Sequence, residues 1–330
     1  MKTTHPMVEL WRGGRLESVH EGHAVVWGDG GMIESWGDPG VIMYPRSSCK
    51  MIQALPMMES GAADAVGLTD RHLALSCASH QGAALHVSMT GRWLADLGLA
   101  EHDLRCGSHE PYDRDERDRL IRADEMPCQL HNNCSGKHCG FLTTTQHLKA
   151  GPEYVDPNHP LQRAILAATE EVTQETVAGF GIDGCSAPNF AVSLSGLARA
   201  MQAFAAARDT GDARARAMVR LRDAMAAHPE LVAGEGRACT ELMRAMDHKV
   251  TIKTGAEGVF VAMIPDRKMG IALKIADGAS RASEAVVVAL LIRLGVLDAK
   301  HPMAQKRLPA VQRNWRGIQT GELRLAAGFM

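Results

Sequence analysis

Hydrophobic and polar positions along the 330-residue chain change their spacing twice. Near the N-terminus, "HAVVWGDGGMIESWG" places two β-prone runs on either side of Gly-Asp-Gly-Gly, a pattern typical of a hairpin. From Ser47 onward apolar residues recur at helical spacing, and Pro56 predicts a kink or break in the first such stretch. The same spacing predicts helices at about 84–97, 136–148, 160–175, 191–208, 212–227 and 238–247.

The last third of the chain returns to a strand pattern. "KVTIKTGAEGVFVAMIPDRKMGIALKIADG" predicts three strands with a turn at 265–268, and an apolar helix follows from about Ser280 to Leu294. Strands at both ends predict an α/β (α+β) fold with a mixed, mainly antiparallel sheet packed with helices. The sheet is expected from about residues 1–45 and 248–330, and a mostly helical region from about 46–247.

Composition narrows the class of protein. Hydrophobic residues make up 45%, charged residues 22%, and the net charge is −2, so no basic surface for nucleic acid or anionic membranes is expected. The N-terminus lacks the apolar core of a signal peptide, and the apolar run at 285–292 is too short to span a membrane. We therefore expect a cytoplasmic protein whose residues 1–330 form a single compact unit. Its eight cysteines should be mostly buried thiols.

A Ser-x-x-Lys motif runs from Ser47 to Lys50 within "YPRSSCKMIQALP". Residues three apart share a helix face, so Lys50 could accept the Ser47 proton if burial or nearby cations lower the lysine pKa. The alternative is an ordinary helix cap followed by a solvated lysine. Ser48 is a rival nucleophile, but two residues before Lys50 it faces away on a regular helix.

A second motif, Lys253-Thr254-Gly255, follows near the C-terminus. Ser-x-x-Lys early and Lys-Thr-Gly late is the layout of serine β-lactamases and penicillin-binding proteins. The Ser-Asp-Asn motif expected between them is absent, and "SCASHQG" stands in its place, with Ser79 followed by a histidine and a glutamine. This departure argues against a true β-lactamase.

Two cysteine-containing stretches carry a possible metal site. "HNNCSGKHCGF" at 131–141 predicts the start of a helix, with Cys134 and Lys137 three residues apart. "GIDGCSAPNF" at 181–190 predicts a tight loop that contains Cys185. Two thiolates from separate loops suit zinc, but a complete site needs four donors, and a lysine serves only as a neutral amine. Ordinary burial of each cysteine is the alternative.

Together, "PRSSCK", "SCASHQG", "NNCSGKHCGF", "GIDGCSAPNF" and "KTGAEG" resemble the rhizobial-type L-asparaginases, also called class 3 or the asparaginase II family. The resemblance runs from about Tyr44 to Gly278. It implies a serine-β-lactamase-like fold, a homodimer, and hydrolysis of L-asparagine to L-aspartate and ammonia. No nucleic-acid or membrane partner is expected.

The resemblance also implies roles for individual residues. Ser47 matches the nucleophile and Lys50 its partner, while Ser79 and Lys253 match a second Ser-Lys pair. Arg46 matches a residue that holds the substrate carboxylate.

Further positions match the metal site and the rest of the pocket. Cys134, Lys137 and Cys185 match a zinc site, for which we expect an auxiliary rather than a directly catalytic role. The other matches are to substrate-binding positions: Asp183, a nearby carboxylate, and His138, which lines the pocket. Separately, we expect backbone N–H groups near Ser47 and around Gly255 to stabilise an oxyanion. Two positions depart from the family pattern: Cys139, where a small residue is expected, and Ser186, where glycine is expected.

Three other functions are compatible with these residues. The first is another serine amidohydrolase of the same fold, such as a glutaminase, a peptidase or a β-lactamase-like enzyme. The second is a zinc-dependent hydrolase in which the serines take no part. The third is a non-catalytic zinc or redox sensor that uses Cys134, Cys139 and Cys185, which would leave the Ser-Lys motifs without a purpose.

Overall fold

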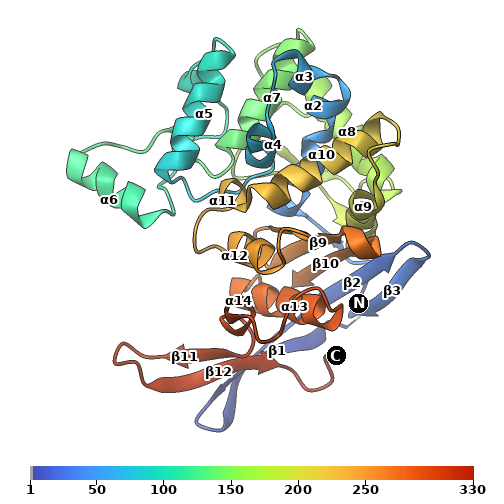
Figure 1. The fold of residues 1–330 in the computed structure, drawn as a ribbon, viewed down its shortest axis with the longest axis vertical. Coiled ribbons are helices and arrows are strands. Elements are labelled where there is room, and N and C mark those ends of the chain that lie inside the picture. Colours follow the sequence, from blue (N-terminus) through green and yellow to red (C-terminus); the bar gives the residue numbers. More distant parts are fainter. Residues whose placement is uncertain (1–2) are drawn as a thin grey trace. The chain divides into compact units, whose positions relative to one another are not determined.

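The computed structural model describes residues 3–330 and divides the chain into two units (Figure 1). The sheet unit comprises Met1–Met43, Ser193–Ala206 and Glu241–Met330. The helical unit comprises Tyr44–Val192 and Ala207–Thr240. The expectation of a single compact unit over the whole chain stays a prediction.

The sheet unit is built on one antiparallel sheet with strand order β11-β12-β1-β2-β10-β9-β8, and β3 pairs with β2. Figure 1 shows the N-terminal strands, in blue, beside the C-terminal strands, in red. The strands are β1 (His5–Arg12), β2 (Arg15–Gly28), β3 (Gly31–Trp36), β8 (Thr251–Thr254), β9 (Val259–Ile264), β10 (Met269–Ile275), β11 (Ala310–Arg313) and β12 (Gln319–Leu325), with a short β4 (Ile42–Met43). Both termini therefore contribute to one sheet, as predicted.

Local chemistry explains the hairpins of this sheet. Asp29 and Gly30 form the two-residue turn between β2 and β3, and Gly28 pairs with Gly31, which confirms the predicted hairpin. The predicted turn between β9 and β10 is a 3₁₀ turn, η4 (Pro265–Arg267). Every residue of β9 is buried, so its continuous apolar run is that of a strand covered on both faces.

Helices α9 (Leu194–Ala206) and α13 (Ser280–Arg293) pack against the strands, and α14 (Pro302–Gln305) follows. Helix α9 contacts β2, β9 and β10, while α13 contacts β1, β9, β10 and β12. A side chain at Gly270 of β10 would collide with the backbone of α9 at Ala198 and Gln202, so glycine permits this close approach.

The helical unit contains short helices around a buried central helix. Its helices are α1 (Lys50–Gln53), α2 (Leu55–Glu59), α3 (Ala62–Ala65), α4 (Asp70–Ser76), α5 (Ala84–Asp96), α6 (Arg114–Ala123), α7 (Ser135–His147), α8 (Pro160–Thr173), α10 (Ala213–Ala227) and α11 (Pro229–Val232), with 3₁₀ turns η1 (Arg46–Cys49), η2 (Glu101–Asp103) and η3 (Gln129–His131). A small hairpin joins β5 (Phe180–Ile182) to β6 (Pro188–Phe190). The remaining elements, β7 (Val192–Ser193) and α12 (Ala238–Ala245), span the points where the chain passes between the two units.

Helix α7 is the core of the helical unit. Residues 135–145 are all buried, and α7 contacts α2, α3, α4, α5 and α8. A Cβ atom at Gly136 would collide with the carbonyl oxygen and side chain of Leu75, so glycine lets α7 lie against α4. The start of α7, where two of the three predicted metal ligands lie (Cys134 as the N-cap residue and Lys137 in the first turn), is therefore held by close backbone packing.

The predicted fold class is confirmed: a mainly antiparallel sheet comes from both ends of the chain, and the middle is mostly helical. The six predicted middle helices occur as α5, α7, α8, α9, α10 and α12. Pro56 does interrupt its stretch, because it lies in the first turn of α2 and a separate α1 precedes it. Within residues 3–330, no helix is both long and apolar enough to cross a membrane.

Candidate active site

The Ser-x-x-Lys motif lies on a change of helix type. Arg46 to Cys49 form the 3₁₀ turn η1, and Lys50 begins α1. The Ser48 side chain is buried, and its hydroxyl donates to the Pro45 carbonyl at 2.7 Å. Ser47 is partly exposed, makes no side-chain cap bond, and has no hydrogen-bond partner for its hydroxyl among residues 3–330. Of the two serines, Ser47 is the one that remains available to react.

Lys50 is buried, with a relative exposure of 1%. Its Nζ atom donates to the carbonyl oxygen of Ala78, lies 3.5 Å from the carbonyl oxygen of Asn133, and lies 3.2 Å from Cys134 Sγ. The alternative of a solvated surface lysine is therefore wrong. The contact with Ala78 also places Lys50 beside the segment that carries Ser79.

The second predicted Ser-Lys pair falls on two different units. Ser79 is buried in the helical unit, and its backbone N–H donates to Val232 O at 2.9 Å. Lys253 is fully buried on β8 of the sheet unit, where its Nζ atom donates to Thr254 O at 2.9 Å. Their pairing stays a prediction. The Gly255 N–H donates to Val259 O at 2.8 Å, so an oxyanion donor near Gly255 is not this N–H group.

Arg46 and Asp183, both predicted at the substrate, form an ion pair. Arg46 Nη2 and Nε lie 2.9 and 3.1 Å from Asp183 Oδ1. The Arg46 backbone has φ +52°, a left-handed conformation, and its N–H donates to Asn189 Oδ1 at 3.2 Å. The contacts with Asp183 and Asn189, both in the 181–190 segment, thus fix the orientation of Arg46.

The three predicted metal ligands converge in the helical unit. Cys134 is the N-cap residue of α7, Lys137 lies one turn later, and Cys185 lies at the tip of the β5–β6 hairpin. Lys137 Nζ donates to Cys185 Sγ at 3.1 Å, and Lys137 also lies over the ring of Phe141, 5.1 Å from its centroid. All three ligands are buried, with exposures of 3–4%.

The protonation of this cluster follows from its charges. The pKa of Cys185 is well below its ordinary value, first because its thiolate accepts a hydrogen bond from Cys134 and then because Lys137 is near. The pKa of Cys134 is raised by that hydrogen bond and by burial. Burial alone would lower the pKa of Lys137, but the two sulfur atoms raise it above its ordinary value. Without a metal, the cluster is a Cys185 thiolate paired with a Lys137 ammonium.

Whether these residues fit zinc depends on Lys137. Among residues 3–330, no group of three or more His, Cys, Asp or Glu side chains is placed to hold a metal ion. Two soft sulfur donors and one amine nevertheless meet in a buried position, and one sulfur is already a thiolate. The donor set therefore fits zinc when Lys137 supplies the third protein ligand as a neutral amine.

Two neighbours of the cluster have other contacts. His138 Nδ1 lies 2.9 Å from the Tyr154 hydroxyl, and burial lowers the pKa of His138 to about 4. Cys139 Sγ contacts the carbonyl oxygen of Thr90 at 3.9 Å, and burial raises the pKa of this thiol well above its ordinary value. Cys139 is thus a buried neutral thiol directed at α5.

Asn133 is a residue that sequence reasoning did not assign. Its carbonyl accepts from the His80 N–H at 3.2 Å as well as contacting Lys50, and its N–H donates to His109 Nε2 at 2.9 Å. His109 comes from the segment before α6. The signal in the sequence is the pair of asparagines before Cys134, whose residue type is typical of turns and helix caps.

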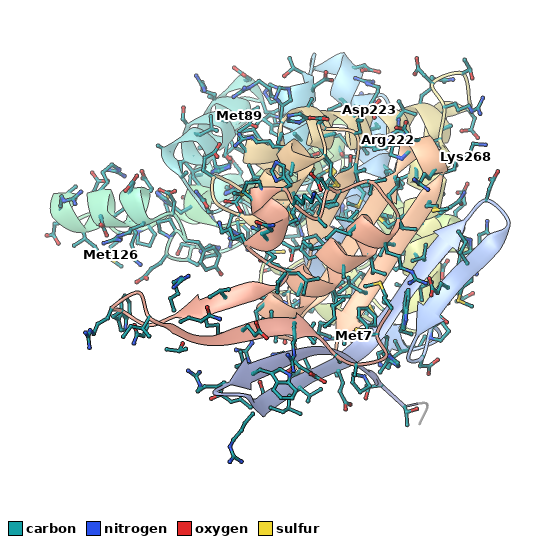
Figure 2. The ribbon with its side chains drawn as sticks, turned by 60° about the horizontal axis from the view of Figure 1, so that its bottom comes forward. Met7, Met89, Met126, Arg222, Asp223 and Lys268 are labelled. Atoms are coloured by element: carbon teal, nitrogen blue, oxygen red, sulfur yellow. The ribbon has the colours of Figure 1, made fainter. Side chains whose placement is uncertain are left out.

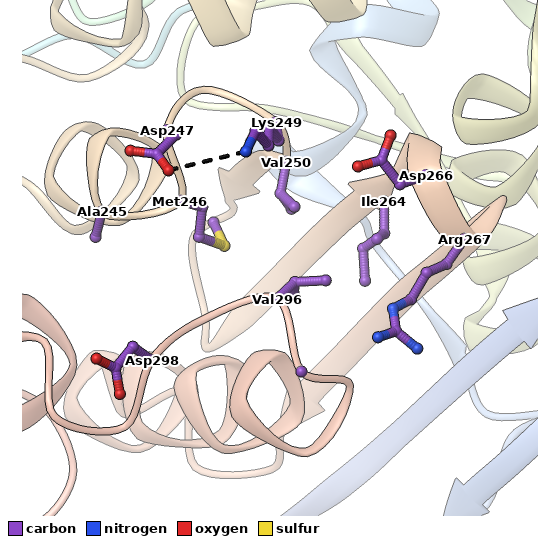
Figure 3. A pocket seen from close by; sticks show the side chains of 11 residues that line it. Ala245, Met246, Asp247, Lys249, Val250, Ile264, Asp266, Arg267, Val296 and Asp298 are labelled. Atoms are coloured by element: carbon purple, nitrogen blue, oxygen red, sulfur yellow. Dashed lines mark ion pairs between the residues drawn. The ribbon is translucent and has the colours of Figure 1, made fainter.

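A groove of about 690 Å³ lies in the sheet unit (Figure 3). Its lining includes the apolar side chains of Ile264 and Val296, and Asp247 Oδ2 lies 3.9 Å from Lys249 Nζ. None of the predicted site residues lines it.

The predicted departure at Ser186 has a structural consequence. Ser186 has φ +69°, a conformation that glycine adopts without cost, at the turn where its N–H donates to Asp183 O at 2.8 Å. We expect Ser186→Gly to raise the free energy of unfolding by about 0.5–1 kcal/mol. Relief of about 1–2 kcal/mol of left-handed strain would be partly offset by about 0.5–1 kcal/mol of added chain entropy.

Urea unfolding of Ser186→Gly beside Ser186→Ala tests this expectation. Alanine removes the hydroxyl but keeps the Cβ atom, so it should give no stabilisation. Equal stability of the two variants would show that the backbone conformation is not the source of strain.

The chain matches the L-asparaginase II family model over residues 8–325 and therefore belongs to that family. Membership of this family makes the protein an amidohydrolase. No curated protein matches the chain closely enough to be counted as a relative.

Similar solved structures share little sequence with the chain. A β-lactamase from Mycobacterium bovis is 11% identical, with 82% of this chain and 94% of that chain covered and a TM-score of 0.39. The D-alanine carboxypeptidase AmpC from Burkholderia cenocepacia is 13% identical, with 84% and 93% covered and a TM-score of 0.44. Mglu, in its native form with 4.3 M NaCl, is 14% identical, with 89% and 66% covered and a TM-score of 0.48.

Proposed function

We propose that the protein is an L-asparaginase that hydrolyses L-asparagine to L-aspartate and ammonia. The observation that carries the proposal is the geometry of its Ser-x-x-Lys motif, in a chain of the L-asparaginase II family. Ser47 has an unengaged, partly exposed hydroxyl, and three residues later Lys50 is buried with its Nζ atom held by backbone carbonyl groups. A free hydroxyl followed three residues later by a buried amine is an arrangement that covalent amide cleavage can use.

In the proposed reaction, Ser47 Oγ attacks the side-chain amide carbon of asparagine, and neutral Lys50 accepts the hydroxyl proton. Ammonia leaves with that proton, and water then hydrolyses the aspartyl ester. Ser79 lies one residue after Ala78, whose carbonyl binds Lys50, so it is suited to positioning that amine. Lys253 is proposed as the partner of Ser79, as the family resemblance implies.

Arg46 is proposed to bind the substrate α-carboxylate. Its guanidinium is partly exposed and already pairs with Asp183, so a carboxylate ligand would either share or replace this partner. Asp183 would then set the orientation of Arg46, and His138 and Gly255 would contribute to the surrounding pocket.

Zinc is proposed as an auxiliary metal held by Cys134, Lys137 and Cys185. When bound, it would supply a soft cationic centre that ties the start of α7 to the β5–β6 hairpin. Zinc binding would fix the position of the 181–190 segment and, with it, that of the Arg46–Asp183 ion pair. The Ser-Lys groups would still carry out the cleavage. The proposal also includes a homodimer, which the family resemblance implies, in the cytoplasm.

Zinc binding should depend steeply on pH. Cys185 is already a thiolate, but Cys134 must lose its thiol proton and Lys137 its ammonium proton, because the pKa values of both are raised. About two protons should be released per zinc, so affinity should rise about 100-fold per pH unit near neutrality. Titration calorimetry in buffers of different ionisation enthalpy measures this proton count.

Two variants control the zinc titration. Cys185→Ser should lose most of the affinity, whereas Cys139→Ala should bind as the wild type does, since Cys139 is directed at Thr90. Affinity that does not change with pH, or that survives in Cys185→Ser, would contradict the proposed ligand set.

Ammonia release from L-asparagine and L-glutamine, with and without a chelator, tests the function. Release from asparagine that persists after chelation supports the proposal. A preference for glutamine would make the protein a glutaminase of the same fold, and complete loss on chelation would favour a zinc-dependent hydrolase. No release from either amide would favour a sensor.

A further inference from the structure

Cys128 differs from the other cysteines in its access to solvent. All eight cysteines lie within residues 3–330; seven are buried, and Cys128 is partly exposed. It lies on the segment between α6 and η3, two residues after Met126, which is 86% exposed and projects from this segment in Figure 2. A small reagent can therefore reach this part of the chain.

A histidine lies beside the Cys128 thiol. Cys128 Sγ is 3.4 Å from His131 Nδ1, and the Cys128 backbone N–H donates to the same nitrogen at 3.1 Å. Since a backbone N–H can only donate, Nδ1 carries a lone pair, and the neutral ring has its proton on Nε2. The thiol proton is thus within reach of an unprotonated imidazole nitrogen.

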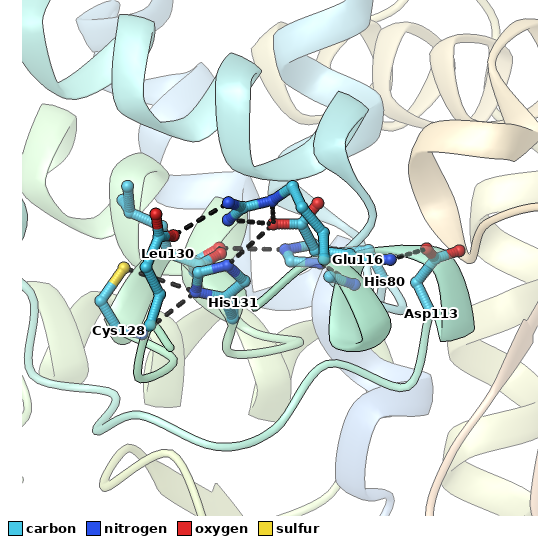
Figure 4. A network of polar contacts seen from close by, with 10 residues as sticks. His80, Asp113, Glu116, Cys128, Leu130 and His131 are labelled. Atoms are coloured by element: carbon cyan, nitrogen blue, oxygen red, sulfur yellow. Dashed lines mark hydrogen bonds and ion pairs between the residues drawn. The ribbon is translucent and has the colours of Figure 1, made fainter. Parts of the chain in front are cut away.

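The other side of the His131 ring faces a buried carboxylate (Figure 4). His131 Nε2 is 3.4 Å from Glu116 Oε1, and the same oxygen accepts from Arg119 Nη2 and Nε at 2.9 and 3.0 Å. The pKa of Glu116 is held below its ordinary value, first by the Arg119 hydrogen bonds and then, against the effect of burial, by His131. Glu116 therefore remains a carboxylate on the Nε2 side of the His131 ring.

Capping alone does not account for this arrangement. The bond from the Cys128 N–H to His131 closes a capping box at η3, which requires only Nδ1. A cap does not need a buried carboxylate on Nε2. With Glu116 in this position, the arrangement consists of a thiol, a base within hydrogen-bond reach, and a third group that orients the base.

We propose that Cys128 is a covalent modification site that takes low-molecular-weight disulfides, with His131 as its base and Glu116 as a positioning residue. In the reaction, the thiol proton passes to His131 Nδ1 and Cys128 Sγ attacks one sulfur of the disulfide. A new S–S bond forms at Cys128 and the original S–S bond breaks. The departing thiolate takes the proton from Nδ1.

The proposal is independent of the amidohydrolase site, because none of its residues is assigned to asparagine cleavage. The charged groups around it are Glu116 and Arg119 from α6, Glu125, which pairs with Arg119 at 2.9 Å, and Glu101, which accepts the Gln129 N–H at 2.7 Å. Of these, only Glu116 contacts His131.

The folded protein is treated with bis(2-hydroxyethyl) disulfide from pH 6 to 9, and the occupancy of each cysteine is followed by peptide mass mapping. We expect Cys128 to form a mixed disulfide before any other cysteine. Glu116→Gln should slow its modification about tenfold at pH 7 and shift the rate profile to higher pH, since the protonated base loses its carboxylate. His131→Gln should slow it further, and glutamine can keep the capping box.

Glu125→Gln is the matched control. It removes a second carboxylate from Arg119 but leaves His131 untouched, so the rate at Cys128 should not change. Faster modification of another cysteine would overturn the proposal. So would equal rates in the wild type, Glu116→Gln and Glu125→Gln. The modification rates of Glu116→Gln and Glu125→Gln test the proposal even if His131→Gln does not fold.

Discussion

Ser47→Ala is expected to lower ammonia release from L-asparagine by about 10⁴-fold or more, because it removes the nucleophile of the proposed acyl-enzyme. The fold should be unaffected: the Ser47 side chain is partly exposed, and its hydroxyl has no hydrogen-bond partner among residues 3–330. A surface change of this kind alters the free energy of unfolding by about 0.5 kcal/mol at most. Steady-state ammonia release and urea unfolding of the same preparation measure both quantities.

The neighbouring serine supplies the control. Ser48→Ala removes a buried hydroxyl that donates to Pro45 O at 2.7 Å, so it should cost about 1 kcal/mol of stability and leave most of the activity. The reverse result, an inactive Ser48→Ala and an active Ser47→Ala, would assign the nucleophile to the rival serine.

Lys50→Met is expected to lower the turnover rate by about 10²–10⁴-fold, the range for loss of a general base. Methionine has a similar length, but it cannot accept a proton or donate to the oxygens of Ala78 and Asn133. Leaving a buried carbonyl unpaired costs about 1–3 kcal/mol, so stability should fall as well. Turnover is therefore measured well below the melting temperature.

Two further lysine variants separate catalysis from stability. Lys50→Arg keeps a donor at this position but cannot be deprotonated, so it should be as inactive as Lys50→Met. Lys300→Met changes an exposed lysine and should affect neither quantity. Substantial turnover by Lys50→Arg would exclude Lys50 as the base.

The elements that sequence patterns predict well are those with strong local signals. The Asp29-Gly30 turn and the continuous apolar run of β9 specify their strands without help from distant residues. The stretch after Ser47 was predicted as helical with a break at Pro56, but its division into α1, α2 and α3 depends on packing. The β5–β6 hairpin was not predicted, because its three-residue strands are too short to show a period.

In the candidate site, too, some contacts could be expected from the sequence and others could not. The family resemblance implies that Cys134, Lys137 and Cys185 share one site, and the structure brings them together. The ion pair of Arg46 with Asp183 joins residues 137 positions apart, and no local pattern encodes such a contact. The contact of Lys50 with Asn133, and that of His131 with Glu116, are likewise tertiary, so periodicity could not reveal them.

Rapid acid quenching of the enzyme with L-asparagine, followed by peptide mass mapping, tests the central claim most directly. The account predicts a transient aspartyl ester on Ser47, which forms as ammonia is released and is absent from Ser47→Ala. An aspartyl group on another side chain, or undiminished ammonia release by Ser47→Ala in the same experiment, would contradict it.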